Sequence, residues 1–205
     1  MNLQQLHKEI DNCFNCKLSK LSCNTLDSNN PIYGKLLTNY KIKNPEKPKL
    51  LLIGISPSFL RFDSQRRAFE GVSPSNNLNE IKTSGDFFYF VLDKSKLKEY
   101  DIYITNLLKC SIENNSQPEE ESIKQCQRLL ELEIKIVKPD YIITMGNLVK
   151  NYVSKMRLEK KILAIKHPSF YFRFKSEKSV QDELKEFNDL ADFIEKDCVL
   201  LNRWV

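Results

Sequence analysis

The chain has 205 residues, of which 41% are hydrophobic and 29% are charged. That is typical of one globular domain, spanning residues 1–205, that buries roughly 70% of the surface its unfolded chain exposes. No run reaches the roughly 18 apolar residues of a membrane span, and the N-terminus lacks the apolar core of a secretory signal, so we expect a cytoplasmic protein without membrane contact. The net charge of +5 is compatible with a polyanionic partner but does not identify one.

Alternating strands and helices are predicted along the chain. The first 30 residues are expected to form a polar helix that carries Cys13 and Cys16, followed by a loop. Four short apolar runs are predicted as buried strands, and they are residues 50–54, 102–106, 141–146 and 161–165. Helices are predicted for the segments 87–92, 117–137, 147–156 and 179–197.

This alternation predicts an α/β fold, a three-layer α/β/α sandwich with a central four-stranded, mostly parallel sheet. Ligands of such sheets bind at the carboxyl ends of the strands. The residues at those ends are Gly54, Ile55, Ser56, Asn106, Gly146 and the His167-Pro168-Ser169 segment. The fold prediction therefore already indicates one edge of the sheet as the site.

Four of the six cysteines have spacings that suit a metal centre. Cys13 and Cys16 form a C-x2-C pair, while Cys110 follows a strand and Cys126 lies on the next helix. The four thiols suit either a zinc ion or a [4Fe–4S] cluster, and spacing alone does not choose between them. The alternative for Cys110 and Cys126 is that they are small buried apolar residues.

The motifs in their order resemble the iron–sulfur branches, families 4 and 5, of the uracil-DNA glycosylase superfamily. The resemblance runs from Cys13 to about Phe172 and includes the C-x2-C pair, Gly54-Ile55-Ser56-Pro57, Ser84-Gly85-Asp86 and the segment from Ile104 to Cys110. An apparent insertion over residues 72–83 precedes Ser84, and the last of these motifs is His167-Pro168-Ser169. The resemblance implies a [4Fe–4S] cluster on Cys13, Cys16, Cys110 and Cys126, and DNA as the partner of a protein that we expect to be a monomer.

The resemblance also implies a role for each residue of the site. Asn106 and His167 are expected to recognise the base and stabilise its developing negative charge, and Asp63 to orient the attacking water. Phe69 would stack on the flipped base in a pocket that includes Gly54, Ile55, Ser56 and Ser169. The residues expected to contact DNA are Arg61, Arg66, Arg67, Tyr171 and Arg173.

Each of these residues also has a purely structural interpretation. Asn106 could be a turn residue, His167 a structural histidine, Phe69 a core residue and Asp63 a loop cap. Asp86 is a weaker alternative acid, because Ser-Gly-Asp is also typical of a helix N-terminus.

The activity expected is that of a monofunctional DNA glycosylase that removes uracil and leaves an abasic site. Ile55 stands where family 4 usually has an acidic residue, so hypoxanthine or a bulkier modified pyrimidine of viral DNA is an alternative substrate. A non-catalytic iron–sulfur DNA-binding module is the alternative from another class of protein. The joint presence of Phe69, Asn106 and His167 favours the enzyme.

Overall fold

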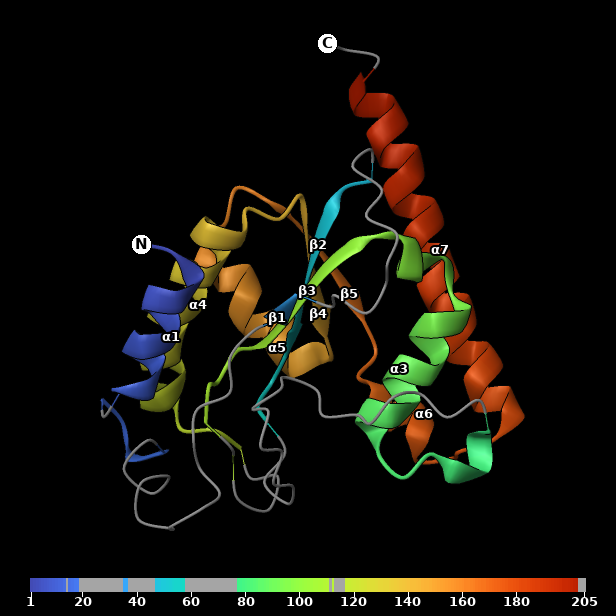
Figure 1. Cartoon of the computed structure of the whole chain (residues 1–205), viewed down its shortest axis with the longest axis horizontal. Helices are drawn as coiled ribbons and strands as arrows, with labels where there is room; N and C mark the ends of the chain where they lie inside the picture. The colour runs from blue at the N-terminus through green and yellow to red at the C-terminus, as the bar shows by residue number, and fades with distance from the viewer. Residues whose placement is uncertain are drawn as a thin grey trace.

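A central sheet with helices on both faces forms the protein, as the computed structural model shows for residues 1–13, 15–18, 35–36, 47–57, 77–110, 112 and 117–202 (Figure 1). The strands lie in the order β1-β3-β2-β4-β5. The four longer strands run parallel: β2 (Lys49–Gly54), β3 (Asp101–Asn106), β4 (Tyr141–Met145) and β5 (Lys161–Ile165). The α/β sandwich with a four-stranded parallel sheet is thus confirmed, and the short antiparallel strand β1 (Lys35–Leu36) extends it.

The two faces of the sheet carry different helices. On one face lie α4 (Glu120–Val137) and α5 (Asn147–Val153), and α1 (Leu3–Asp11) packs on the outside of α4. The other face is covered by α3 (Ser84–Lys94), α6 (Pro168–Phe172) and α7 (Glu177–Asn202). Single 3₁₀ turns complete the chain at η1 (Leu78–Glu80), η2 (Lys96–Glu99) and η4 (Ser154–Met156).

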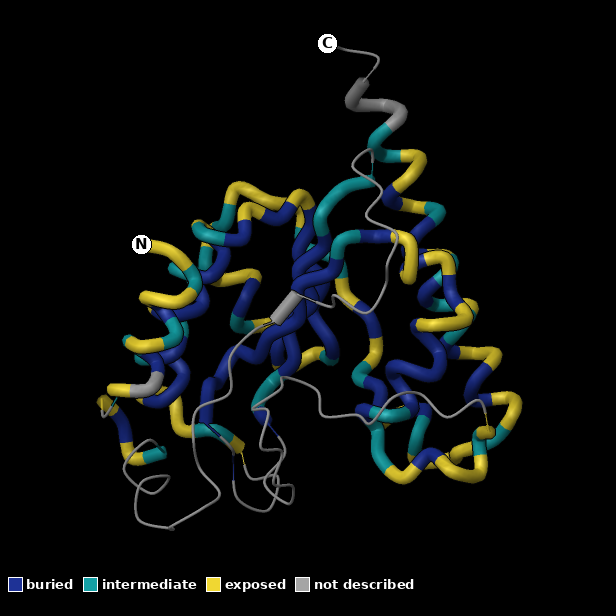
Figure 2. The backbone as a smooth tube through the Cα atoms, viewed as in Figure 1, coloured by how far each residue is buried: buried dark blue, intermediate teal, exposed yellow. Residues whose placement is uncertain are grey.

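Two apolar cores follow from this layering. Strand β2 alternates, so that Leu50 and Leu52 face the α3/α7 side while Leu51 and Ile53 face the α4/α5 side. Figure 2 shows the strands buried along the middle of the molecule, with exposed residues on the outer turns of the helices. Strands that are buried on both faces consist of near-continuous apolar residues, and these apolar runs predicted the four parallel strands from the sequence.

The N-terminal helix is shorter than the sequence predicted. Helix α1 ends at Asp11, and Asn12 caps it with its backbone N–H bonded to the Lys8 and Ile10 carbonyls. Cys13 and Cys16 therefore lie beyond the helix and not on it. Helix α6 was not predicted; Pro168 stands at its first position, where the missing N–H costs no hydrogen bond. None of the described helices is long and apolar enough to cross a membrane.

Candidate functional site

The carboxyl ends of the parallel strands gather the candidate residues along one edge of the sheet. Gly54 at the end of β2 is the register partner of Asn106 at the end of β3. Beyond the strands, the Leu107 N–H donates to the Gly54 carbonyl (2.8 Å) and the Leu108 N–H to the Ile55 carbonyl (2.9 Å). The segment after β2 and the segment after β3 are therefore fixed to each other.

The side chain of Asn106 is buried and has hydrogen-bonding groups that a ligand could use. Only 1% of its surface is exposed. Within the described part of the chain, neither Oδ1 nor Nδ2 of its side chain has a hydrogen-bond partner. Leaving a buried amide unpaired costs about 1–3 kcal/mol per polar group. A ligand that offers one donor and one acceptor would remove that cost.

His167 stands two residues beyond β5, as the N-cap of α6. Its Nδ1 accepts a hydrogen bond from the Ser169 backbone N–H (3.2 Å) and lies 2.8 Å from the Ser169 hydroxyl. Because a backbone N–H can only donate, Nδ1 carries the lone pair, and the proton of the neutral ring is on Nε2. Burial lowers the pKa of His167 from its ordinary value of 6.5, which favours this neutral form.

Gly146 fixes the turn next to His167. Its φ of 93° is in the region that favours glycine, and its N–H donates to the Ile165 carbonyl at the end of β5 (2.8 Å). A Cβ at Gly146 would lie 3.5 Å from the Cβ of His167, an ordinary contact distance. Backbone conformation, and not lack of space, is therefore what requires glycine at the exit of β4.

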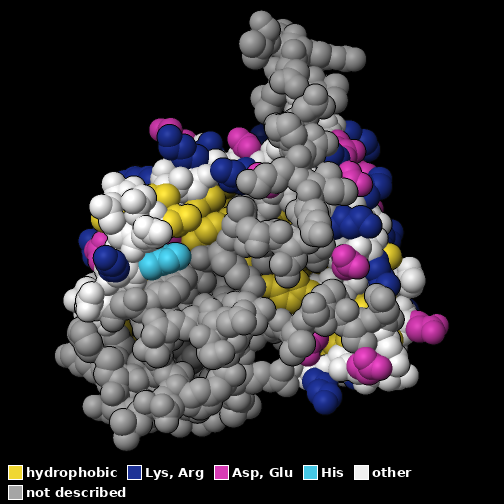
Figure 3. Space-filling view, in the orientation of Figure 1, with side chains coloured by type: hydrophobic (Ala, Val, Ile, Leu, Met, Phe, Trp, Pro, Cys, Tyr) yellow, Lys and Arg dark blue, Asp and Glu magenta, His cyan; other side chains and the backbone are white. Residues whose placement is uncertain are grey.

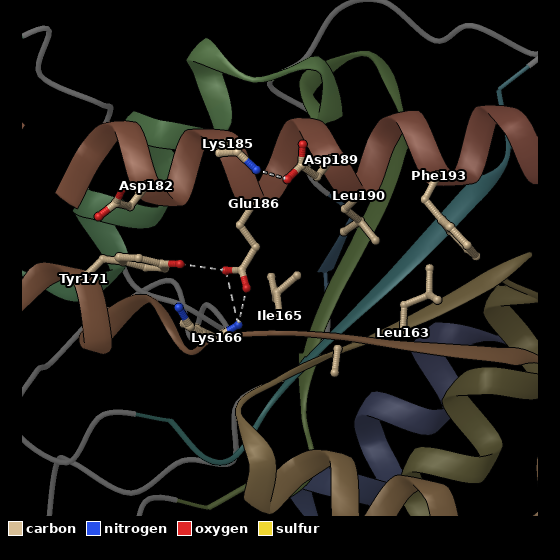
Figure 4. A pocket seen from close by; sticks show the side chains of 11 residues that line it. Leu163, Ile165, Lys166, Tyr171, Asp182, Lys185, Glu186, Asp189, Leu190 and Phe193 are labelled. Carbon is tan, nitrogen blue, oxygen red and sulfur yellow. Dashed lines mark hydrogen bonds and ion pairs between the residues drawn. The ribbon is translucent and has the colours of Figure 1, made fainter. Parts of the chain in front are cut away.

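The segment on both sides of His167 is anchored to α7 through Glu186 (Figure 4). The Glu186 carboxylate accepts from the Lys166 backbone N–H (3.2 and 3.3 Å) and from the Tyr171 hydroxyl (3.3 Å). These bonds lie in a groove of about 450 Å³ between β5 and α7. Tyr171, for which a DNA contact was predicted, is 96% buried, because its ring packs into the α3/α7 core.

The exposed aromatic rings near Tyr171 are those of Phe170 and Phe174. Phe170 is 46% and Phe174 is 67% exposed, and their ring centroids lie 6.4 Å apart. The Lys166 ammonium lies 4.9 Å from the Phe170 centroid, and Arg173, another predicted DNA contact, is exposed. On the face drawn in Figure 3, basic and acidic side chains are interspersed over the described surface.

The four predicted ligand cysteines come from three segments of one side of the sheet. Cys16, Cys110 and Cys126 are buried and Cys13 is half-buried. Packing of Leu6 and Ile10 of α1 against Leu129 of α4 brings the C-x2-C segment toward Cys126. The pKa of the Cys126 thiol is raised to about 11, mainly by burial; a hydrogen bond to the Lys109 backbone opposes this rise, and the nearby Cys16 and Cys13 add to it.

Whether these thiols suit a metal centre depends on the kind of centre. Among the described residues, no three His, Cys, Asp or Glu side chains converge closely enough for a single metal ion. A [4Fe–4S] cluster does not need such convergence, because each thiolate binds a different iron atom. Ser122 lies one turn before Cys126 on α4, and its buried hydroxyl has no hydrogen-bond partner in the described ranges. A polar group bound beside the thiols could therefore form a hydrogen bond with this hydroxyl. Four thiols, one for each iron atom, are the donor set that such a cluster needs.

One feature that the sequence analysis missed is a buried ion pair beside Asn106. Lys109 and Glu133 have side-chain exposures of 1% and 0%. The available signal was a lysine in the otherwise apolar segment between Asn106 and Cys110. Lysine is usually exposed, so its position in that segment did not predict a role.

Several predicted residues lie outside the described part of the chain. They are the candidate water-orienting acid, the candidate stacking ring and three candidate phosphate contacts: Asp63, Phe69, Arg61, Arg66 and Arg67. Asp86 is described, and its structural interpretation has direct support. Its N–H donates to the Thr83 hydroxyl (3.0 Å) and its carboxylate accepts from the Lys82 N–H (3.3 Å), as in a helix N-terminal cap.

The fold and the sheet edge match a known family. The model of the uracil DNA glycosylase superfamily matches residues 41–191, about three quarters of the chain, and the chain belongs to this superfamily. Asn106, Cys110, Cys126 and His167 lie inside the matched segment, whereas Cys13 and Cys16 precede it.

Individual relatives place the chain near one branch of the superfamily. It is 27% identical over 174 residues to the type-4 uracil-DNA glycosylase of Saccharolobus solfataricus. The aligned residues cover 83% of this chain and 68% of that protein. The chain is 29% identical over 146 residues to the type-4 uracil-DNA glycosylase of Pyrobaculum aerophilum, covering 71% of this chain and 61% of that protein. The predicted resemblance to an iron–sulfur branch is confirmed at this level.

Proposed function

We propose that this protein is a monofunctional DNA glycosylase that hydrolyses the N-glycosidic bond of deoxyuridine in DNA and leaves an abasic site. The observation that carries the proposal is the buried amide of Asn106, which has no hydrogen-bond partner in the described part of the chain and lies at the strand ends where a ligand would bind. Membership of the superfamily and the names of the type-4 relatives support the same activity.

Asn106 can read the edge of uracil. Its Nδ2 donates to the O4 carbonyl of the base, and its Oδ1 accepts from the N3–H. Such a contact requires that the nucleotide leave the base stack, because these edges are paired inside a duplex. The existing burial of Asn106 means that the contact forms in a nearly dry site, where an unmatched base leaves its amide unpaired.

His167 supplies charge stabilisation at the leaving base. Breakage of the glycosidic bond leaves negative charge on the uracil ring, including its O2 atom. A neutral imidazole that holds its proton on Nε2 donates a hydrogen bond to that charge without carrying a charge of its own. Ser169 orients the ring through the two contacts to Nδ1.

The remaining roles come from the sequence. Asp63 orients the attacking water, and Phe69 stacks on the flipped base beside Gly54, Ile55 and Ser56. Arg61, Arg66, Arg67 and Arg173 bind phosphates. Because Tyr171 is buried, the exposed rings of Phe170 and Phe174 take the DNA-facing place that had been predicted for it.

We further propose that Cys13, Cys16, Cys110 and Cys126 hold a [4Fe–4S] cluster. The bound cluster would supply four iron–thiolate bonds that join the N-terminal segment, the segment after β3 and helix α4. Four thiols, of which those of Cys16, Cys110 and Cys126 are buried, provide one ligand for each iron atom and support this choice.

The proposal is tested by mass spectrometry of free bases released from two DNAs in parallel, one containing uracil and one viral DNA with modified pyrimidines. Release of uracil supports repair-type activity even though Ile55 replaces an acid. Release of a modified base alone would replace uracil as the substrate. Release from neither, by protein with a full iron content, would overturn the glycosylase assignment and favour a non-catalytic DNA-binding module.

A further inference from the structure

A fully satisfied polar network surrounds the buried Lys109–Glu133 ion pair. The Lys109 ammonium donates to Glu133, to the Thr105 hydroxyl (2.8 Å) and to the Asn106 backbone carbonyl (2.8 Å), so each of its three N–H groups has an acceptor. Glu133 also accepts from the Tyr103 hydroxyl (3.2 Å) and from the Thr105 hydroxyl (2.9 Å). These residues join the end of β3 to the C-terminal part of α4.

Stability alone is a poor explanation for this pair. Removing two charges from water is costly, and well-packed apolar residues of similar volume are often as stabilising as a buried ion pair. The network nevertheless places a charged donor on the main-chain carbonyl of Asn106, the residue whose side-chain amide no other described residue contacts through a hydrogen bond. An apolar pair would fill the space but would leave that carbonyl without its donor.

The pair also lies between Asn106 and the cysteines. Lys109 immediately precedes Cys110, and its backbone is hydrogen-bonded to the Cys126 thiol. On α4, Glu133 follows Cys126 by seven residues, which is about two helical turns and puts both side chains on the same face of the helix. Lys109 is therefore connected to Asn106 through its side chain and to the cysteine region through its main chain.

We propose that Lys109, held by Glu133, is a positioning residue that fixes the Asn106 main chain so that its amide faces the base. This inference rests on the proposed function, because it assigns to Asn106 the reading of the base. Lys109 does not contact the substrate. It restricts the end of β3 to one conformation, and misplacement of a recognising group by about 1 Å can cost roughly 100-fold in rate.

The test uses the cluster-loaded, full-length protein with both charges neutralised together, Lys109→Met with Glu133→Gln. Neutralising both avoids an uncompensated buried charge, and the glutamine keeps an acceptor for Tyr103 and Thr105. We expect unchanged iron content and DNA affinity, but a single-turnover rate of uracil release that is 10- to 100-fold lower. Lys124→Met with Glu120→Gln, which removes an exposed ion pair from the same helix, is the matched control and should keep the wild-type rate.

A double-mutant cycle with Asn106→Ala separates positioning from general damage. If Lys109 acts through Asn106, neutralising the pair in the Asn106→Ala background changes the remaining rate by no more than about 2-fold. The same loss in both backgrounds, or no loss in either, would show that the pair is only structural, while the active wild type would leave the glycosylase assignment intact.

A crystal structure of the double variant tests the inference without any activity. Displacement of the Asn106 carbonyl and amide relative to β2 supports the positioning role. An Asn106 that keeps its place overturns it, whatever bases the wild type releases.

Discussion

The Asn106 region and the His167 region lie at the same sheet edge but are held in different ways. The Asn106 carbonyl accepts from the Lys109 ammonium of a buried ionic network, and the N–H of the next residue, Leu107, donates to the Gly54 carbonyl of β2. His167 sits on a short connection that Glu186 of α7 holds from a partly exposed groove. Hydrogen bonds in a dry interior are stronger and more costly to break than those that water can replace. Disruption of the Asn106 region should therefore affect folding or rate more than disruption of the His167 region.

The largest effect is expected for Cys110→Ala. Loss of one cluster ligand frees the segment after β3, because binding of a structural metal centre is coupled to folding. We expect colourless, poorly soluble protein, measured by visible absorbance, iron content and the yield of soluble protein. Cys198→Ala, at a half-buried cysteine outside the proposed ligand set, is the control. Soluble Cys110→Ala protein with full iron content would remove this cysteine from the ligand set.

Asn106→Ala should come next in size. The change removes the hydrogen bonds to the base but leaves the phosphate contacts, so we expect about 100- to 1000-fold slower uracil release at nearly unchanged DNA affinity. Single-turnover kinetics and equilibrium binding measure the two quantities. Unchanged turnover would exclude Asn106 from reading the base and would make its burial a purely structural matter.

Glu186→Ala tests the more weakly held region. The Lys166 N–H and the Tyr171 hydroxyl lose their acceptor, but both groups are near enough to the groove for water to replace it. We expect a loss of about 10-fold in rate, on the scale of one misplaced catalytic group partly restored by water. Asp189→Asn, which changes an exposed ion pair of the same helix, should leave the rate unchanged. A loss as large as that of Asn106→Ala would show that the two regions are equally rigid.

The pH dependence of the rate reports on His167. Burial lowers its pKa below 6.5, so the neutral ring persists at pH 6.5 and is lost only as pH falls through the lowered value. The same shift stabilises the folded protein above pH 6.5, and that contribution disappears on acidification because the unfolded chain takes up the proton first. The acid limb of the single-turnover rate should therefore lie below pH 6.5 and be absent in His167→Asn. A limb above pH 6.5 would contradict the neutral-imidazole role.

A smaller effect, on stability alone, is expected at Glu183 of α7. Burial raises the pKa of this carboxyl to about 9, and neither of its oxygens has a hydrogen-bond partner within the described residues. Between the unfolded value of 4.5 and about 9 the native state holds the proton more tightly, so stability falls as pH rises through this interval. Glu183→Gln should raise Tm by roughly 5 °C at pH 8 and change it little at pH 4.5. Equal shifts at both pH values would show that Glu183 is already ionised in the folded state.

Much of the candidate site could be predicted because its residues follow recognisable local patterns. The apolar runs before Gly54 and Asn106 indicated strands, and parallel strands end at the same edge. The burial of Tyr171 could not be predicted from such local patterns. This residue lies among residues with exposed rings and charges, yet helix α6 turns its side chain into the core. A five-residue helix started by proline gives too short a pattern to show which face is buried.

The sequence by itself determined the strands, the cysteine spacing and the residues at the strand ends, since these depend on local hydrophobicity and short-range order. Only the tertiary structure decided the strand order that pairs Gly54 with Asn106, and the meeting of Lys109 with Glu133 across 24 residues. In the sequence both charged residues look solvent-exposed. Their burial is possible because the folded chain supplies a partner for each charge, and such partners come from packing between elements that no local pattern encodes.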